Sequence, residues 1–285
     1  MITIIDGQKL AEAIKDKIVK QIVELNGDRP NLAIVLIGSR TDSKLYVDLK
    51  EKEAKKVGID THIYRCEKST EEEEIINTIE CLNKDTSIDA ILVQLPLPRG
   101  YNTDKIIKTI DPTKDVDRFH PDNQKILLET CSHAHVIPPV FQVVIEMLKS
   151  INCELENKQV CLLTNSDIFS IGLQKVLECQ KAKVNITHPD NSNLKEKTSQ
   201  ADILITAIGK PNFIKKDMIK KDAIIIDIGI TKKNKKVYGD ANFNDLKNKA
   251  SFISPVPGGV GPMTIAMLFK NTLELYKQRR KQEEK

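Results

Sequence analysis

Tyr46 and Lys50 are four residues apart in the stretch "DSKLYVDLKEKEAKKVGI", which is typical of a helix that begins near Ser43 and ends at Gly58. Residues at this spacing share one helix face, so the phenol and the amine point in the same direction. A lysine that faces a cleft loses hydration, which lowers its pKa and lets it exchange protons near neutral pH. The alternative is a solvated lysine whose stem passes over the tyrosine.

Gln94 ends an apolar run in "ILVQLPLP", and Pro96 and Pro98 stop strand pairing directly after it. In an open α/β sheet, ligands bind beyond the carboxyl ends of the strands. We therefore expect Gln94 to contact both a substrate and Lys50. A structural glutamine that caps the end of the strand is the alternative.

Two aspartates, Asp115 and Asp117, are two residues apart in the loop "DPTKDVDRFHP". A carboxylate in such a loop can accept paired N–H bonds from a ligand, or it can stabilise the turn itself. The sequence leaves both interpretations open.

The segment "PVPGGVGPMT", from Pro255 to Thr264, holds three glycines and three prolines in ten positions. Proline fixes φ and glycine allows positive φ, so we expect neither a helix nor a central strand there. One interpretation is a tight connection before a helix that Thr264 caps. The other is a ligand-binding loop whose amide groups face a bound molecule.

Composition limits the class of protein. The chain has 285 residues, enough for one large or two medium domains, with 40% hydrophobic and 29% charged residues, as in soluble globular proteins. The net charge is +4 with the two signs mixed, which does not fit a nucleic-acid-binding face but suits a small anionic ligand. No apolar run is long enough to span a membrane, and the start lacks a signal-peptide pattern, so we expect a soluble, cytoplasmic enzyme.

The six cysteines show neither a CxxC pair nor a disulfide framework, so we expect reduced thiols. Cys131, His133 and His135 lie two apart in "CSHAH". A metal ion would need a further ligand, and none is evident nearby. We therefore interpret this segment as a polar linker and expect no metal site.

Helical patterns alternate with apolar runs along the chain. The runs are "NLAIVLIG", "THIYRC", "DAILVQLPLP", "KQVCLLT", "AKVNIT", "ADILITAIG" and "DAIIIDIGI". Such runs are typical of buried strands in parallel sheets, so we expect α/β layers with helices on both faces. The aperiodic, Pro-, Asp- and His-rich residues between Asp111 and Pro139 indicate a domain boundary or a site loop. The amphipathic helix "TIAMLFKNTLELYKQRR" is expected to return to the first domain, with the ligand cleft between the two domains.

Six motifs together resemble the bifunctional methylenetetrahydrofolate dehydrogenase/cyclohydrolase family, the FolD type. They are "DSKLYVDLKEKEAKKVGI", "VQLPLP", "DVDRFHPDN", "ADILITAIGKPNFI", "AIIIDIGI" and "SPVPGGVGPMTIAML". The resemblance spans nearly the whole chain, and "PVPGGVGPMT" is its most specific element. It implies a folate-binding catalytic domain, residues 1–130 with the returning helix 264–285, and a Rossmann-like NAD(P)-binding domain, residues 131–263.

The resemblance implies two reactions. The first is oxidation of 5,10-methylenetetrahydrofolate to 5,10-methenyltetrahydrofolate by NADP+, with NAD+ as a possible acceptor. The second is hydrolysis of the methenyl compound to 10-formyltetrahydrofolate. It further implies a homodimer and a place in one-carbon metabolism, which serves purine, methionine and histidine biosynthesis.

Residue roles follow from the matching motifs. Lys50 resembles the family's catalytic lysine, Gln94 the amide that tunes it, Tyr46 the tyrosine that stacks on the folate, and Asp117 the aspartate that holds the pterin. The loop that closes on the folate site in this family corresponds to Pro257, Gly258 and Gly259. The cofactor residues correspond to Thr164, Asn165, Ser166 and Ile230.

The second domain departs from the family pattern where nucleotide phosphates bind. The family has Gly-Arg-Ser-x-x-Val-Gly-x-Pro where this chain has "TNSDIFSIG". Thr164 and Ser170 replace the glycines, Asn165 replaces the arginine, and Gly172 replaces the proline. Losing the glycines hinders close approach of the backbone to a phosphate, and losing the arginine removes a cation suited to a 2′-phosphate.

Two further motifs differ. Pro139, Val140, Phe141 and Val143 replace the residues of the family's Pro-Cys-Thr-Pro-x-Gly motif that follow its first proline. In "DVDRFHPDNQKIL", Arg118 and Lys125 replace glycines. Arg118 is expected either to pair with Asp117 or to attract the glutamate tail of a folate.

Three hypotheses follow. The protein is a divergent bifunctional enzyme that binds NADP or NAD through other backbone amides and Ile230, an enzyme that retains mainly the cyclohydrolase step, or a folate-binding homologue without turnover. The retained Tyr46, Lys50, Gln94 and Asp117 favour the two enzymatic hypotheses, because a binding protein has no need of a tuned lysine.

Overall fold

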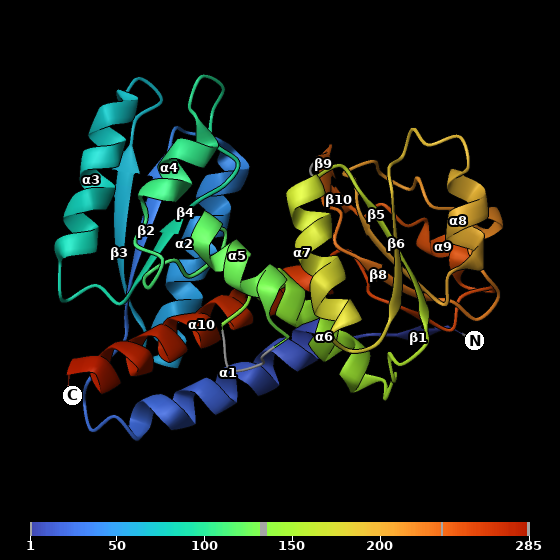
Figure 1. Cartoon of the computed structure of the whole chain (residues 1–285), viewed down its shortest axis with the longest axis horizontal. Helices are drawn as coiled ribbons and strands as arrows, with labels where there is room; N and C mark the ends of the chain where they lie inside the picture. Colours follow the sequence, from blue (N-terminus) through green and yellow to red (C-terminus); the bar gives the residue numbers. More distant parts are fainter. Residues whose placement is uncertain (1, 132–135, 235, 284–285) are drawn as a thin grey trace. The chain divides into compact units, whose positions relative to one another are not determined.

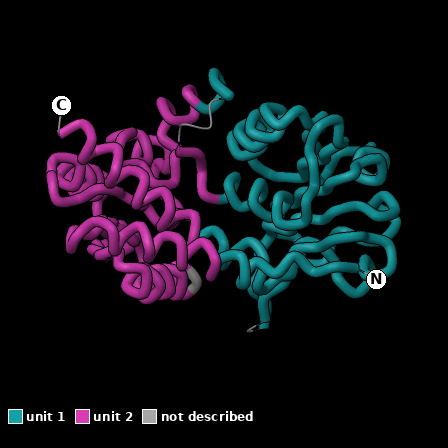
Figure 2. Tube along the Cα trace, turned by 90° about the horizontal axis from the view of Figure 1, so that it is seen from below, with its two compact units in different colours: residues 1–11, 127–132, 140–264 teal, residues 12–126, 133–139, 265–285 magenta. Residues whose placement is uncertain are grey.

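The computed structural model describes residues 2–131, 136–234 and 236–283 (Figure 1). Its contacts divide the chain into two compact units, coloured separately in Figure 2. Unit 1 comprises residues 1–11, 127–132 and 140–264, and unit 2 comprises residues 12–126, 133–139 and 265–285. The chain therefore passes from unit 1 to unit 2 and back more than once.

Unit 2 is built around a three-stranded parallel sheet in the order β3-β2-β4. Its strands are β2 (Asn31–Ile37), β3 (Asp60–Cys66) and β4 (Ala90–Val93). Its helices are α2 (Thr41–Val57), α3 (Glu72–Lys84) and α4 (Thr103–Thr109), joined by parts of α1 (Gly7–Val23), α5 (Pro121–Glu129) and α10 (Val260–Glu283).

The central strand β2 shows why this sheet is covered on both faces. Leu32, Ile34 and Leu36 pack in one hydrophobic cluster with residues of α1, α2 and α10. The alternating residues Ala33, Val35 and Ile37 belong to a second cluster with residues of α3 and α4. Because successive side chains of a strand point to opposite faces, a continuous apolar run is the pattern that two covered faces require.

Unit 1 contains a six-stranded parallel sheet in the order β1-β11-β8-β7-β5-β6. The strands are β1 (Thr3–Ile4), β5 (Gln159–Thr164), β6 (Lys183–Thr187), β7 (Ile203–Ala207), β8 (Ile224–Asp227) and β11 (Phe252–Ile253), and an antiparallel pair is formed by β9 (Thr231–Lys233) and β10 (Lys236–Tyr238). The helices are α6 (Pro139–Ser150), α7 (Asp167–Glu178), α8 (Leu194–Gln200) and α9 (Phe243–Leu246), with a 3-10 turn η1 (Lys216–Met218).

Figure 1 shows α7 and α8 on opposite sides of β5 and β6. The alternation of β5 explains this arrangement, because Cys161 and Leu163 pack in one cluster with Leu194 of α8 and Leu246 of α9. Two α/β units with parallel sheets confirm the predicted fold class.

Each apolar run of the sequence forms a strand, β2 to β8, as predicted. The expectation that all of them are buried is wrong for β3 and β6, in which exposed residues recur along the strand. Both strands lie at the edge of their sheet, where one side has no neighbouring strand. The short strands β1, β9, β10 and β11 were not predicted, because two or three residues carry too little periodicity.

The domain boundaries 130/131 and 263/264 stay a prediction, as does the expected cleft. The compact units differ from them at the N-terminus, because Thr3 and Ile4 pair in parallel with Phe252 and Ile253 of β11. The two residues of β1 thus pair with the sheet of unit 1, whereas the sequence analysis assigned them to the folate-binding domain.

The segment from Pro255 to Thr264 divides into a loop and a helix start. Helix α10 begins at Val260, four residues before the expected cap, and the Thr264 hydroxyl donates to the Val260 carbonyl inside it. The expectation that this segment holds no helix is therefore wrong for its second half. Pro262 is compatible with the first helical turn, since the N–H groups there have no intrahelical acceptor.

The loop half is packed backbone against backbone. A Cβ atom at Gly7 would overlap the carbonyl of Gly259, and one at Gly259 would overlap the carbonyl of Pro255. Gly258 has a φ of 99°, a value that favours glycine. These contacts show that glycine is needed for close approach within unit 1 as well as for backbone freedom.

Cys131 and Cys179 form a disulfide, with their Cα atoms 5.4 Å apart. The expectation of reduced thiols is wrong for these two residues, which are 48 positions apart and brought together by the fold. Cys179 is the C-cap residue of α7. His133 and His135, considered as metal ligands, lie outside the described residues.

Among residues 2–131, 136–234 and 236–283, no helix combines the length and the apolar character needed to cross a membrane.

We predict that the disulfide protects two of the six cysteines from alkylation. In denaturant without reductant, an alkylating reagent should label Cys66, Cys81, Cys153 and Cys161 but neither Cys131 nor Cys179, as peptide mass spectrometry can show. The double variant C131S/C179S should lose about 3–4 kcal/mol of unfolding free energy, because the bridge closes a long loop. Labelling of Cys131 in the unreduced protein would contradict this prediction.

Candidate active site

The lysine and the glutamine singled out in the sequence meet in unit 2. Lys50 lies on α2 and Gln94 directly follows β4, and the Lys50 Nζ donates to the Gln94 Oε1 at 2.8 Å. The Gln94 Nε2 donates to the Leu95 carbonyl at 2.6 Å, so the amide oxygen is the atom left to face the lysine. The expected contact is present, and the ammonium does not point into open solvent.

Asp117 reaches the same place because residues 114–116 run beside β4. The Ile91 N–H donates to the Lys114 carbonyl and the Val116 N–H to the Ile91 carbonyl, which makes a parallel bridge between Ile91 and Asp115. In parallel pairing, two residues further along each strand bring Asp117 level with the end of β4. Asp117 therefore emerges at the carboxyl edge of the sheet, next to Gln94.

Burial shifts the pKa values of the two charged groups toward each other. Desolvation lowers the pKa of Lys50, and the charge of Asp117 opposes that shift. Desolvation raises the pKa of Asp117 to about 6, and Lys50 opposes that shift while Asp115 adds to it. The lowered pKa increases the fraction of neutral amine at Lys50, and the raised pKa increases the fraction of protonated carboxyl at Asp117.

The two aspartates of the loop, which the sequence could not tell apart, have different surroundings in the structure. Asp115 is buried and accepts hydrogen bonds from the Arg118 N–H, the His120 N–H and the Asn123 Nδ2, which is the turn-stabilising role. Asp117, by contrast, interacts electrostatically with Lys50. The turn-stabilising interpretation therefore holds for Asp115, and the ligand-binding interpretation stays a prediction for Asp117.

Arg118 interacts with backbone carbonyls and Asp115 rather than forming the expected pair with Asp117, and the alternative role, attraction of a folate tail, stays a prediction. Its side chain donates from Nε to the Val136 carbonyl and from Nη1 to the Pro112 carbonyl, and the carboxylate that acts on it is that of Asp115. Its φ of 62° lies in the left-handed region, which agrees with a glycine at this position in the family pattern. Lys125, the other glycine replacement, is exposed on α5.

The remaining substrate residues lie in both units. Tyr46 is half-buried on α2, one turn before Lys50, as predicted from their spacing. Pro257, Gly258 and Gly259 form the packed loop of unit 1 described above. The structure thus brings together Lys50, Gln94 and Asp117, whereas the roles assigned to all of these residues remain predictions.

A buried asparagine that the sequence analysis did not single out, Asn271, holds the backbone next to Asp117. Asn271 of α10 is 1% exposed, and its Nδ2 donates to the carbonyls of Val116 and Ile137. It fixes the backbone immediately before Asp117. An amide within the apolar face of the helix "TIAMLFKNTLELY" was the available signal, since a buried amide needs hydrogen-bond partners.

The predicted cofactor residues lie at the carboxyl edge of the sheet in unit 1. If β5, β6, β7, β8 and β11 are numbered 1 to 5 along the chain, their order across the sheet is 2-1-3-4-5. The direction in which successive strands are added to the sheet therefore reverses between β5 and β7. That reversal is where doubly wound sheets bind nucleotides. Thr164 ends β5, and the Asn165 Nδ2 donates to the Ile208 carbonyl at 2.7 Å, joining the loops that follow β5 and β7.

Hydroxyl groups shape the loop that lacks the family's glycines. The Thr164 Oγ1 accepts from the Ser166 N–H at 2.8 Å, and the Ser166 Oγ caps α7 by accepting from the Phe169 N–H at 3.3 Å. The Ser170 hydroxyl donates to the Ser166 carbonyl at 2.7 Å. Residues 165–168 are exposed, so the N-terminal turn of α7 faces solvent.

Aromatic packing accompanies the two altered motifs. The rings of Phe141 on α6 and Phe169 on α7 meet edge to face, with their centroids 5.3 Å apart. Phe141 is fully buried, as is Val143. The segments "IPPVFQVV" and "TNSDIFSIG" are therefore in contact with each other through these rings, at the junction of α6 and α7.

Two buried carboxylates order the loops around Ile230. Asp227 accepts from the N–H groups of Gly229, Asp240 and Ala241, and burial together with Asp240 raises its pKa to about 7. Asp240 accepts from the Thr206 hydroxyl and from the N–H groups of Ile208 and Lys210. Ile230 follows this network and is 45% exposed, as a residue that contacts a cofactor must be.

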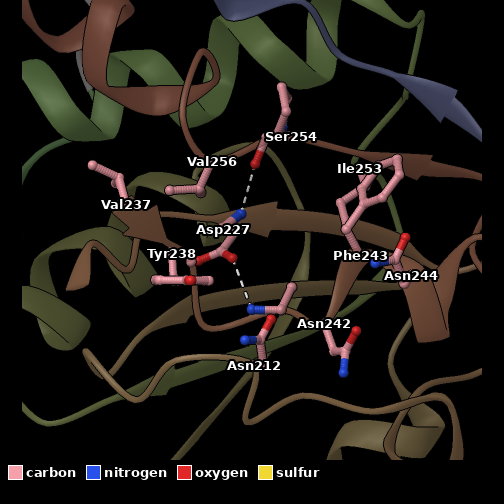
Figure 3. A pocket seen from close by; sticks show the side chains of 13 residues that line it. Asn212, Asp227, Val237, Tyr238, Asn242, Phe243, Asn244, Ile253, Ser254 and Val256 are labelled. Carbon is pink, nitrogen blue, oxygen red and sulfur yellow. Dashed lines mark hydrogen bonds between the residues drawn. The ribbon is translucent and has the colours of Figure 1, made fainter. Parts of the chain in front are cut away.

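A cavity of about 460 Å³ lies beside Asp227 (Figure 3). Its lining includes Asn212, Tyr238, Asn242 and Ser254, and the Ser254 Oγ accepts from the Asp227 N–H. None of the predicted site residues lines it. Among the described residues no group of three or more His, Cys, Asp or Glu side chains is placed to hold a metal ion.

Comparison with known proteins identifies the family. The tetrahydrofolate dehydrogenase/cyclohydrolase catalytic domain matches residues 5–117, and the NAD(P)-binding domain of the same family matches residues 138–280. The bifunctional protein FolD of a Nitratiruptor species is 42% identical over 281 residues, covering 98% of this chain and 99% of that protein. These matches confirm the resemblance inferred from the motifs.

Two solved structures agree. The bifunctional FolD methylenetetrahydrofolate dehydrogenase/cyclohydrolase of Campylobacter jejuni superimposes with a TM-score of 0.93 at 35% identity, over 98% of this chain and 100% of that chain. The Trypanosoma brucei methylenetetrahydrofolate dehydrogenase-cyclohydrolase, complexed with NADP and an inhibitor, has a TM-score of 0.93 at 30% identity, over 98% of each chain.

We predict that removing the lysine charge raises the pKa of Asp117. In Lys50→Met the attraction that now favours the carboxylate is lost while its burial remains, so the Asp117 pKa should rise above about 6. Carbon-13 NMR of labelled aspartate side chains measures it. Lys52→Met, at an exposed position of the same helix, is the control and should leave the value unchanged. An unchanged Asp117 pKa in Lys50→Met would contradict the electrostatic contact.

Proposed function

The chain belongs to the tetrahydrofolate dehydrogenase/cyclohydrolase family, and we propose that it catalyses both reactions of a bifunctional enzyme. It oxidises 5,10-methylenetetrahydrofolate to the methenyl compound with a nicotinamide dinucleotide, and it hydrolyses the methenyl compound to 10-formyltetrahydrofolate. The observation that carries the proposal is the hydrogen bond between Lys50 and Gln94, with Asp117 beside it at the edge of the sheet.

Asp117 and Tyr46 hold the folate in this proposal. An ionised carboxylate can accept two parallel N–H bonds from the amino and amide groups of a pterin ring, a pairing stronger than that between neutral groups. Tyr46 stacks on the ring from the same helix that carries Lys50. Burial of Asp117 strengthens the contact, because the surrounding medium screens it less than water does.

Hydrolysis requires two proton transfers, which we assign to Lys50. The oxygen of water bonds to the methenyl carbon while one of its protons passes to the neutral amine of Lys50. The bond between that carbon and N5 then breaks, N5 receives the proton from Lys50, and loss of the hydroxyl proton to solvent leaves the formyl group on N10. The lowered pKa of Lys50 supports this role, because it increases the fraction of amine that can act as a base.

Gln94 is a positioning residue for this step. Its Oε1 accepts a hydrogen bond from Nζ whether the lysine is charged or neutral, so the amine keeps its direction through the proton transfers. Its own Nε2 is held by the Leu95 carbonyl, which prevents the amide from turning over.

The exposed N-terminal turn of α7 in unit 1 is suited to the pyrophosphate of a dinucleotide. A helix leaves its first N–H groups without intrahelical acceptors, and the N-terminal turn of α7 is exposed. We propose that Ser166 and this turn hold the pyrophosphate, that Thr164 and Asn165 fix the loop, and that Ile230 contacts the nicotinamide end. When bound, NADP+ or NAD+ supplies the acceptor for the hydride of the methylene carbon.

Assembly and location complete the proposal. Family resemblance supports a homodimer formed through the second domain, which light scattering of the purified chain would test. The same resemblance supports a cytoplasmic enzyme of one-carbon metabolism whose product serves purine, methionine and histidine biosynthesis.

We predict that both reactions occur and that only one depends strictly on the lysine amine. Purified protein should reduce the dinucleotide when given methylenetetrahydrofolate, and it should consume methenyltetrahydrofolate without nucleotide. Lys50→Met should lower the hydrolysis rate at least 100-fold, as expected for loss of general acid–base catalysis, while folate affinity changes little when it is measured at a pH above the raised Asp117 pKa. Lys52→Met is the matched control.

The outcomes separate the three hypotheses. Hydrolysis without dehydrogenase activity would leave a cyclohydrolase, and binding of a folate without either reaction would leave a binding protein. Hydrolysis that persists in Lys50→Met would remove Lys50 from its role.

We also predict that folate binding weakens in acid. Because the pKa of Asp117 is about 6, the carboxylate is mostly ionised at pH 7.5 and mostly protonated at pH 5, and the protonated form cannot accept both N–H bonds. The dissociation constant of tetrahydrofolate should rise about tenfold over this range. Asp117→Asn should bind tetrahydrofolate weakly at both pH values. Any pH dependence that remains in this variant comes from titration of the ligand itself. An equal pH dependence in the two proteins would contradict the assignment.

A further inference from the structure

The residues after β6 include an acidic side chain, Asp190. In doubly wound sheets, an acidic residue roughly 20 positions beyond the phosphate loop accepts the ribose 2′-hydroxyl of NAD, whereas a nearby cation accommodates the 2′-phosphate of NADP. In unit 1, β6 ends at Thr187, and His188, Pro189 and Asp190 follow. Asp190 stands at close to that spacing from Ser166.

Two exposed carboxylates are placed at this edge. The side chain of Asp190 is 92% exposed and that of Asp167, in the first turn of α7, is 80% exposed. His188 joins the two loops, with its Nδ1 2.8 Å from the Thr164 carbonyl oxygen and its Nε2 3.5 Å from an Asp167 carboxylate oxygen. A 2′-phosphate, with a charge of about −2, would enter beside two like charges.

Two lysines near this edge are paired with carboxylates. Lys210, after β7, lies 3.4 Å from Asp190 and over the ring of Phe213. Lys195, at the start of α8, lies 2.8 Å from Asp217. Asn165 stands where the family pattern has arginine, and its amide is used in the bond to the Ile208 carbonyl. The residues present therefore fit a ribose with free hydroxyl groups and do not fit a 2′-phosphate.

We propose that Asp190 makes this enzyme select NAD+ over NADP+, by accepting hydrogen bonds from the adenosine ribose hydroxyls and by repelling a 2′-phosphate. The inference rests on the proposed function, because it assumes that the dinucleotide binds along the β5 and β6 edge. The inference concerns this chain's own residues, because Asn165 lacks the positive charge of the arginine that the family pattern has at this position. Asp167 adds to the repulsion from the neighbouring helix.

The test uses ligands that report the adenosine end without any reaction. Calorimetric titration of the full chain with adenosine 5′-diphosphate and with adenosine 2′,5′-bisphosphate compares a free 2′-hydroxyl with a 2′-phosphate, and titration with NAD+ and NADP+ repeats the comparison for the whole cofactor. We expect each ligand with the free hydroxyl to bind at least tenfold more tightly. The ratio should shrink at high ionic strength, because exposed charges are screened.

Matched variants assign the effect to Asp190. Asp190→Asn should reduce the preference at least threefold, and Asn165→Arg combined with Asp190→Ser should reverse it. Glu156→Gln is the control, because Glu156 is also an exposed carboxylate paired with a lysine, Lys181, but it precedes β5 at the opposite edge of the same sheet. It should leave the ratio unchanged.

The outcomes distinguish the inference from the function on which it rests. Equal or tighter binding of the 2′-phosphate ligands by the unaltered chain overturns the selection by Asp190 while leaving the nucleotide site intact. An unchanged ratio in Asp190→Asn also overturns it. If no adenosine ligand binds, both the inference and the proposed dehydrogenase site fail.

Discussion

The hydrogen bond between Lys50 and Gln94 is the interaction on which the catalytic unit depends. An amine withdrawn from water loses hydration energy, and it stays at its position only if a polar group replaces that water. Gln94 supplies a neutral acceptor and Asp117 a charge, so the lysine is held without being locked in its protonated form. A closer carboxylate in place of the amide would raise the lysine pKa and reduce the fraction of neutral amine.

That arrangement explains the construction of unit 2. The lysine needs a helix, the amide needs the end of a buried strand, and the carboxylate needs a segment running beside that strand. Residues 114–116 provide this segment through their bridge to β4, while Asp115 and Asn271 fix the backbone on either side. Three side chains from three parts of the chain thereby converge on one sheet edge.

Unit 1 shows how the loop between β5 and α7 is held together without the family's glycines. Hydroxyl groups of Thr164, Ser166 and Ser170 bond to the loop backbone, and the rings of Phe141 and Phe169 fill the junction between α6 and α7. The N-terminal turn of α7 remains exposed. The replacements therefore change the walls of the site and its charge while keeping the helix dipole that favours an anion.

Local sequence patterns were sufficient to predict strands β2 to β8, the family and the candidate residues, because apolar periodicity and turn-forming residues act over a few positions. Tyr46 and Lys50 could be placed on one helix face for that reason. Long-range contacts required the folded chain: Lys50 meets Gln94, 44 positions away, and Asp115 stabilises the turn while Asp117 interacts electrostatically with Lys50. The folded chain also turns Arg118 to backbone carbonyls and pairs Cys131 with Cys179. Such contacts depend on strand order and on how the chain returns, and no local pattern encodes the direction of that return.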